Sequence, residues 1–182
     1  MTRIMLAAAA VAVAVMLLPS GSTAQTPLPH AKVGKVERTR AYIGLSYDDG
    51  RVRVYVCNGT SKRSPTISKW FKGRWDGESP LTLGRRGPAV EIEEVHADGR
   101  VTGHLHWRGS EHDFTLRRAT GPAGLYERKK AEGGHRPRGS WVFLADRSFR
   151  GAMVDPRPRK CRPVQVTLAN GTTQIVTVCK SG

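Results

Sequence analysis

A series of tight-turn signals is the feature that most constrains the fold, because it divides the chain into short segments. The turn dipeptides are, in order, Asp49-Gly50, Asp98-Gly99, Arg108-Gly109, Asp146-Arg147 and Asn170-Gly171. Asn-Gly and Asp-Gly favour tight hairpins because these residues tolerate positive φ. The segments between the turns alternate apolar and polar residues, and no stretch after residue 24 keeps a helical apolar period. The sequence therefore predicts an all-β protein, an antiparallel meander that forms a β-sandwich or an open β-barrel with an appended C-terminal β-hairpin.

The N-terminus has the pattern of a secretory signal peptide. An unbroken apolar run extends from Ile4 to Leu18, which is shorter than the roughly 20 residues needed to cross a bilayer. Ser22 and Ala24 are the small residues expected just before a cleavage point. We expect residues 1–24 to be removed and the protein to be secreted, extracellular or associated with the cell envelope. An uncleaved anchor is the alternative.

The remaining chain divides into three parts. The expected organisation is an N-terminal linker over 25–39, a β domain over 40–154, and a linker with the C-terminal hairpin over 155–182. The strands expected in the β domain include 42–47, 52–57, 66–75, 81–83, 141–144 and 149–154. Within 66–75, alternation places Trp70 on the face opposite Phe71 and Trp75. Trp70 is therefore the exposed aromatic candidate for stacking on a ligand.

The chain has three cysteines, and export places them in an oxidising compartment where cysteines tend to pair. If the C-terminal hairpin has a three-residue loop with Gly171 in the left-handed position, Cys161 lies opposite Cys179. A two-residue loop would offset them by one position. The sequence predicts a Cys161–Cys179 disulfide and leaves Cys57 free and buried.

The turns Asp98-Gly99 and Arg108-Gly109 fold residues 89–118 into three strands. If each turn is a two-residue loop, the residues that lie side by side on neighbouring strands, here called a row, follow from the sequence. The opposite, mostly apolar face has Glu94 in a row with Gly103 and Phe114. On the polar face each central-strand histidine is flanked by two carboxylates, and we call this set the His/carboxylate face. Its two rows are Glu91, His106 and Glu111, and Glu93, His104 and Asp113.

The His/carboxylate face has two interpretations. Opposite-charge cross-strand pairs stabilise a solvated sheet by roughly 0.2–1 kcal/mol each. Imidazole and carboxylate together are also a ligand set for a divalent transition metal such as zinc. His104 and His106 lie about 7 Å apart along the strand, so both bind one ion only with help from the carboxylates.

A pH-dependent stability is a weaker alternative to metal binding at the His/carboxylate face. Flanking acids raise the pKa of each histidine, and the resulting stabilisation is present at acidic pH and fades as the pH rises through the raised pKa. The chain has no HExxH, GxSxG or P-loop motif. We therefore expect no catalytic residue, and no cofactor other than zinc in the metal-binding alternative.

The chain is strongly basic, with 30 Lys and Arg against 15 Asp and Glu, and the charge is uneven. Residues 128–162, the basic region, hold eleven Lys and Arg against three acids. Such a region attracts polyanions, and outside the cell these are anionic wall polymers, anionic lipid headgroups or other polyanions. The candidate anion-binding residues are Arg128, Lys129, Lys130, Arg136, Arg138, Arg157, Arg159, Lys160 and Arg162. The expected function is that of an exported binding or cell-envelope protein that contacts an anionic partner, with metal binding as the alternative.

Four short motifs occur in order along the β domain. They are Tyr55-Val-Cys57-Asn-Gly59, Trp70-Phe-Lys-Gly73, Gly121-Pro-Ala-Gly124-Leu-Tyr126 and Trp141-Val-Phe-Leu144. This succession resembles a family of secreted or lipid-anchored actinobacterial all-β domains over about 40–154. The family has Cys-Asp-Gly where this chain has Cys57-Asn58-Gly59, and a Gly-Leu-Tyr-Arg-like strand where this chain has Leu125-Tyr126-Glu127-Arg128. The resemblance implies export, β architecture and a bacterial source, and it transfers no catalytic residue.

Overall fold

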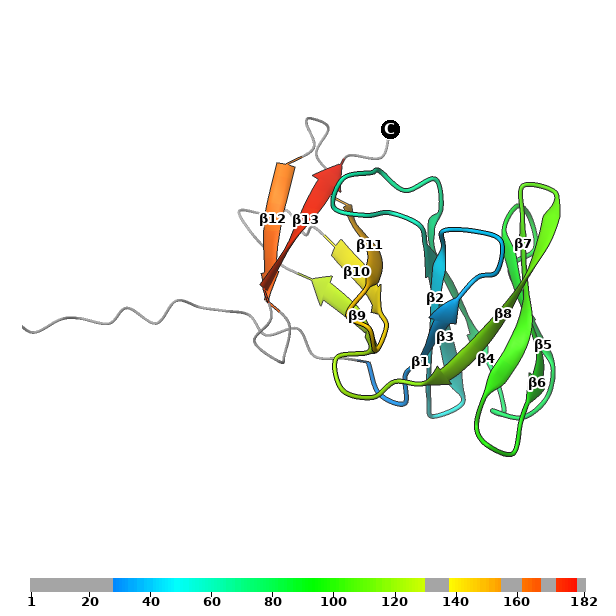
Figure 1. The fold of residues 1–182 in the computed structure, drawn as a ribbon. Helices are drawn as coiled ribbons and strands as arrows, with labels where there is room; N and C mark the ends of the chain where they lie inside the picture. The colour runs from blue at the N-terminus through cyan, green and yellow to red at the C-terminus, as the bar shows by residue number, and fades with distance from the viewer. Residues whose placement is uncertain (1–27, 130–137, 155–161, 168–172, 180–182) are drawn as a thin grey trace, which may run out of the picture.

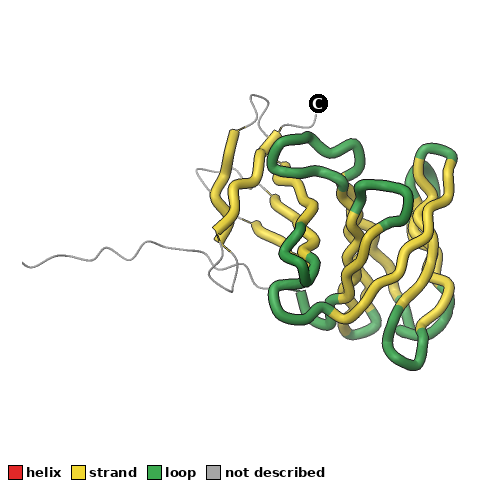
Figure 2. Tube along the Cα trace, in the orientation of Figure 1, coloured by secondary structure: helices red, strands yellow, loops and turns green. Residues whose placement is uncertain are grey.

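The computed structural model describes residues 28–129, 138–154, 162–167 and 173–179, so the expected signal peptide lies outside it. The described residues are all strands and connections, as predicted (Figure 2). None of them forms a helix that is long and apolar enough to span a membrane. The strands are β1 Lys32–Lys35, β2 Tyr42–Asp48, β3 Arg51–Cys57, β4 Ser68–Arg74, β5 Leu81–Leu83, β6 Ala89–Val95, β7 Val101–Trp107, β8 Ser110–Arg118, β9 Gly124–Lys129, β10 Arg138–Phe143, β11 Phe149–Val154, β12 Arg162–Thr167 and β13 Thr173–Cys179.

The first eight strands form one antiparallel sheet in the order β4-β3-β2-β1-β8-β7-β6-β5. The sheet curls around a single apolar core and nearly closes, so it is an open β-barrel (Figure 1). Residues from both edge strands, Phe71 of β4 and Leu83 of β5, belong to this core. A Cβ atom on Gly73 would lie only 2.6 Å from Leu83. Side-chain packing therefore closes the barrel where the backbone pairing stops.

The second sheet has the order β12-β13-β11-β10-β9 and covers the outside of the barrel at β1, β2 and β3. A second apolar cluster fills this interface and includes Val33, Tyr55, Leu125 and Val142. A Cβ atom on Gly44 would lie 3.2 Å from both Leu125 and Val142. Because the second sheet lies on them, residues 42–46 of β2 and 54–57 of β3 are buried on both faces.

Several sequence predictions of pairing are confirmed. Strands β2 and β3 pair Leu45 with Val54 and Gly44 with Tyr55. The C-terminal hairpin has the register of the three-residue loop, from Arg162 opposite Val178 to Thr167 opposite Thr173, and β13 joins the second sheet parallel to β11. Cys161 lies outside the described residues, so its disulfide stays a prediction. Cys57 is free and fully buried, and this burial raises the pKa of its thiol.

The expected linker over 25–39 is wrong for its central part. Strand β1 lies within it and pairs with both β2 and β8, which joins the two halves of the barrel sheet. Val33 is buried between the sheets, and Val36 just beyond β1 is buried in the barrel core. The four-residue strand, with a lysine at each end, is too short for its alternation to be recognised from the sequence.

Candidate metal centre

The strand pairing that positions the His/carboxylate face was predicted correctly on one side only. Strands β7 and β8 pair His104 with Asp113 and His106 with Glu111, as expected. Strands β6 and β7 are displaced by two residues from the expected rows, so Glu91 lies opposite His104. Over residues 89–92 this displacement by two positions keeps the side chains on their original faces, because side chains alternate with period two.

Two structural features, each adding one position, cause this displacement. The turn after β6 has three residues, closed by a hydrogen bond of 2.9 Å from the His96 N–H to the Arg100 carbonyl, with Gly99 at a φ of 78°. A β-bulge also interrupts the pairing between Ile92 and Glu94. The bulge exposes Glu94 beside Glu93, so the expected row of Glu94 with Gly103 and Phe114 is wrong. Regular alternation would have buried the Glu94 carboxylate in the barrel, which is energetically costly.

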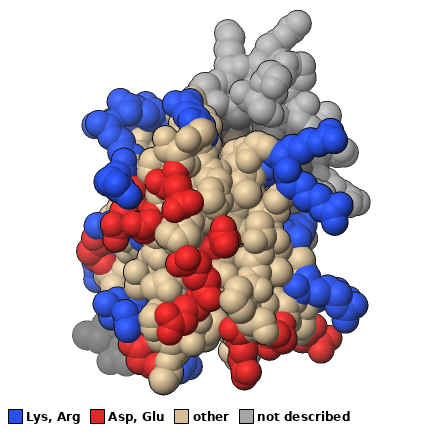
Figure 3. Space-filling model, turned by 90° about the vertical axis from the view of Figure 1, so that its right-hand side faces the viewer, with Lys and Arg blue, Asp and Glu red and all other residues tan. Residues whose placement is uncertain are grey.

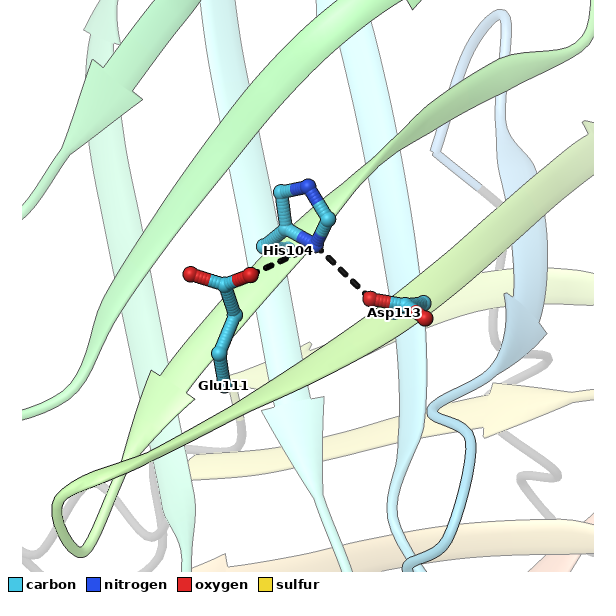
Figure 4. Close-up of side chains that lie close together, drawn as sticks. All are labelled: His104, Glu111 and Asp113. Atoms are coloured by element: carbon cyan, nitrogen blue, oxygen red, sulfur yellow. Dashed lines mark hydrogen bonds and ion pairs between the residues drawn. The ribbon is translucent and has the colours of Figure 1, made fainter.

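His104 lies at the centre of the face and contacts carboxylates on both sides of its ring. Its Nε2 atom lies 2.9 Å from Glu93, and its Nδ1 atom lies 2.8 Å from Asp113 and 3.6 Å from Glu111. Figure 4 shows Glu111 and Asp113 approaching the same ring nitrogen. The ligand atoms of His104, Glu111 and Asp113 all lie within 4.8 Å of one another. The residues therefore form a compact set of one nitrogen and two oxygen donors.

His106 repeats part of this arrangement one row away. Its Nε2 atom lies 3.1 Å from Glu91, and its Nδ1 atom lies 3.6 Å from Glu111. The two imidazole rings have a centroid separation of 6.5 Å. All six residues of the His/carboxylate face are thus in contact, because the long Glu side chains reach diagonally across the displaced rows.

The electrostatic surroundings act on His104 in opposite directions. Partial desolvation lowers its pKa, but the hydrogen bonds to Glu93 and Asp113 and the charge of Glu111 outweigh desolvation, so the pKa is raised. This is the direction predicted for His104. A cation also reaches the face, since Arg38 lies 3.7 Å from the outer oxygen of Asp113.

The carboxylates gather on the side of the barrel formed by β6, β7 and β8. Residues 91–113 hold six of the fifteen Asp and Glu residues of the chain, but only two Arg and no Lys. Figure 3 looks onto this side and shows acidic side chains across the face, with basic side chains toward its margins. A strongly basic protein therefore has one locally acidic face, which favours a cation there.

An open groove adjoins the face at the β7–β8 turn. It has a volume of about 650 Å³. Two members of the His/carboxylate face, His106 and Glu111, line it together with Trp107 and Arg108. The Arg108 guanidinium lies 4.8 Å from the centre of the Trp107 ring. The face is therefore accessible from a concave surface at its His106 end.

Trp70 was expected to be exposed, and this is wrong. The side chain is half-buried between the barrel and the second sheet, where its indole N–H donates a hydrogen bond of 2.8 Å to Ser140. Its ring lies 5.0 Å from the Tyr55 ring and 4.5 Å from the Arg53 guanidinium. The second sheet covers this part of β4, which alternation within one strand does not show.

The candidate anion-binding residues are only partly described. Arg128 is half-buried in β9, and Lys129, Arg138 and Arg162 belong to β9, β10 and β12. Lys130, Arg136, Arg157, Arg159 and Lys160 lie outside the described residues.

Sequence reasoning missed a second group of cations, on the outer face of β3 and β4. Arg51 lies opposite Arg74, and Arg53 lies opposite Lys72. Like charges directly opposite each other destabilise a sheet. Within the described part of the chain, Arg53 forms an ion pair of 2.6 Å with Glu127, whereas the other three cations form none. The signal was present in the alternation Arg51-Val52-Arg53 and Lys72-Gly73-Arg74.

Comparison with protein-family models, with curated proteins and with solved structures gave no match. The resemblance to the actinobacterial domain family therefore stays a prediction.

Proposed function

We propose that the protein is an exported, non-catalytic binding protein that holds a divalent transition metal ion on the His/carboxylate face, and that zinc is the best match. The observation that carries this proposal is the grouping of His104, Glu111 and Asp113, whose ligand atoms lie within 4.8 Å of one another. Strand pairing fixes two of these residues directly opposite each other, because His104 and Asp113 share a row of β7 and β8.

The distances suit the coordination chemistry of zinc. Zinc bonds to nitrogen and oxygen are about 2.0–2.2 Å long, so tetrahedral ligand atoms lie roughly 3.3 Å apart. From Nδ1 of His104, Asp113 lies at 2.8 Å and Glu111 at 3.6 Å, on either side of that value. Small side-chain rotations would therefore complete the site without movement of the strands.

A supporting carboxylate also faces the histidine from β6. Glu93 lies 2.9 Å from Nε2 of His104, on the ring edge away from Asp113. A carboxylate that accepts the second N–H of a ligating histidine fixes its tautomer and its ring orientation. In the proposed site, Glu93 orients the His104 ring. Asp113 and Glu111 neutralise the charge of the ion.

The test is zinc titration of the full processed chain after removal of metal with a chelator. Isothermal titration calorimetry should give saturable binding that His104→Gln abolishes and that Glu93→Gln weakens by about 10- to 100-fold. Glu94→Gln is the matched control, because Glu94 is exposed beside Glu93 and contacts His96 instead of the site. Equal zinc affinity in the parent and in His104→Gln would overturn the proposal.

A second candidate function is contact with an anionic wall polymer through the basic region. The supporting observation is the separation of charge, since the basic region has eleven cations against three acids while residues 91–113 are locally acidic. Polyphosphate is a soluble probe of this function, and its affinity should fall steeply with salt. Neutralising Lys129 and Arg138, which pair across β9 and β10, should reduce the salt dependence. Affinity that does not change with salt would contradict this candidate. We also propose that the protein is secreted and that Cys161 and Cys179 form a disulfide, as expected of an exported protein.

A further inference from the structure

We propose that Glu111 bridges two ion positions, so that the His/carboxylate face is a dinuclear metal centre. This inference rests on the proposed metal-binding function and extends it. The two carboxylate oxygens of Glu111 are shared between the histidines: Oε1 lies 3.6 Å from Nδ1 of His104, and Oε2 lies 3.6 Å from Nδ1 of His106. One carboxylate is thus placed to bind one ion through each oxygen.

A carboxylate contacts the Nε2 atom of each of the two imidazole rings. Glu93 lies 2.9 Å from Nε2 of His104, and Glu91 lies 3.1 Å from Nε2 of His106. A neutral imidazole has a single N–H, and donation from Nε2 leaves a lone pair on Nδ1. In that tautomer each Nδ1 lone pair faces a carboxylate oxygen, and a shared cation, either a proton or a metal ion, stabilises this arrangement.

The spacing of the facing atoms is suited to metal ions. A separation of 3.6 Å is longer than an N–H···O hydrogen bond. It is close to the roughly 3.3 Å expected between two ligands of one zinc ion. The separation of 6.5 Å between the ring centroids excludes a single ion bound midway by both rings in this geometry, and leaves room for one ion beside each ring.

The charge of the face also matches two divalent ions. The four carboxylates Glu91, Glu93, Glu111 and Asp113 surround two imidazoles. With both imidazoles neutral, the four carboxylates and the adjoining Arg38 give the face a net charge of about −3, so a second divalent ion is still attracted after the first has bound. Repulsion between the ions is reduced because the bridging carboxylate lies between them.

The two positions differ in the number of protein ligands. The His104 position has Asp113 as a third ligand. The His106 position has two ligands among the described residues, His106 and Glu111, and both line the open groove. The second ion is therefore expected to bind more weakly and to keep coordination positions open toward the groove.

Native mass spectrometry of the full processed chain during zinc titration measures the number of bound ions. The parent should bind two zinc ions in two steps, and His106→Gln should bind one with the affinity of the first step. Glu111→Gln should weaken both steps, and Glu94→Gln should still bind two. Far-UV circular dichroism checks that each variant keeps the β fold.

The outcomes separate this inference from the function on which it rests. One zinc ion in the parent, unaffected by His106→Gln, overturns the dinuclear centre and leaves the proposed metal binding intact. Absence of saturable zinc binding in the parent overturns both. Two ions that His106→Gln leaves in place would locate the second ion elsewhere and also overturn the bridging role of Glu111.

Discussion

Gly103 is the position where one added carbon atom should have the clearest effect on the face. It lies on β7 opposite Ile92, next to the bulge of β6. A Cβ atom there would overlap the carbonyl oxygen of Glu91 and would lie 2.9 Å from Cζ of Phe114. Since carbon atoms in contact normally lie 3.5–4.0 Å apart, the Phe114 ring would have to move by about 0.5–1 Å, and the Glu91 carbonyl of β6 would have to move further.

The cost of Gly103→Ala follows from these contacts. Overpacking of this kind costs about 1–3 kcal/mol, and the upper part of the range applies because a backbone carbonyl is involved. Replacing glycine within a strand regains about 0.5–1 kcal/mol of unfolded-state entropy. The net destabilisation is therefore about 1–2.5 kcal/mol. For a chain of 182 residues this corresponds to a decrease in Tm of about 2–10 °C.

Urea unfolding followed by tryptophan fluorescence measures this effect as a lower midpoint at an unchanged m value. The same substitution in a Phe114→Leu background separates the two contacts. Because the overlap with the Glu91 carbonyl remains, Gly103→Ala should still destabilise that background. A Gly103→Ala protein as stable as the parent would refute the close approach of β6 and β7 at this point. Full rescue by Phe114→Leu would assign the cost to the ring instead of the strand.

Three further predictions concern the site, the cysteines and the packing between the sheets. The pKa of His104 is raised in the folded protein, so in the metal-free chain its contribution to stability should be present in acid and be lost as the pH rises through that pKa. Urea unfolding measures this. Equal acid stability of the parent and of His104→Gln/His106→Gln would contradict the prediction. Alkylation of the unfolded, unreduced secreted protein should modify Cys57 alone, and mass spectrometry that finds three modified cysteines would exclude the C-terminal disulfide. Trp70→Phe leaves the Ser140 hydroxyl without its indole donor and should lower the free energy of unfolding by about 1–3 kcal/mol. Thermal unfolding measures this, and an unchanged Tm would show that this hydrogen bond between the sheets contributes little.

The two Asp-Gly turns show how far local sequence reasoning extends. At Asp49-Gly50 both residues have positive φ, 46° and 67°, as in a two-residue hairpin, and the predicted register of β2 and β3 is correct. At Asp98-Gly99 only the glycine has positive φ, and the loop has three residues. The same dipeptide supports both loops, so the choice depends on the strands that the turn connects. The bulge before Glu94 is part of that choice, because it keeps the carboxylate out of the barrel.

The residues of the candidate site were predictable, and so were four of their contacts, because each histidine contacts the two carboxylates expected beside it. Alternation places His104 and His106 on one face with the four carboxylates, whichever of the two registers forms. The shared position of Glu111 between the two histidines is a result of side-chain conformation in the folded sheet. The diagonal reach of Glu91 and Glu93 is likewise set by the displaced pairing of β6.

The amino-acid sequence by itself determined the all-β class, the succession of hairpins and the membership of the His/carboxylate face, because turn chemistry and two-residue alternation are local properties of the chain. Tertiary structure alone decided that β1 joins the two halves of the barrel and that the second sheet covers β2 and β3. It also placed Trp70, half-buried, between the sheets. These features depend on contacts between segments far apart in the sequence, and the free energy of burying apolar surface selects among arrangements that local pattern leaves equivalent.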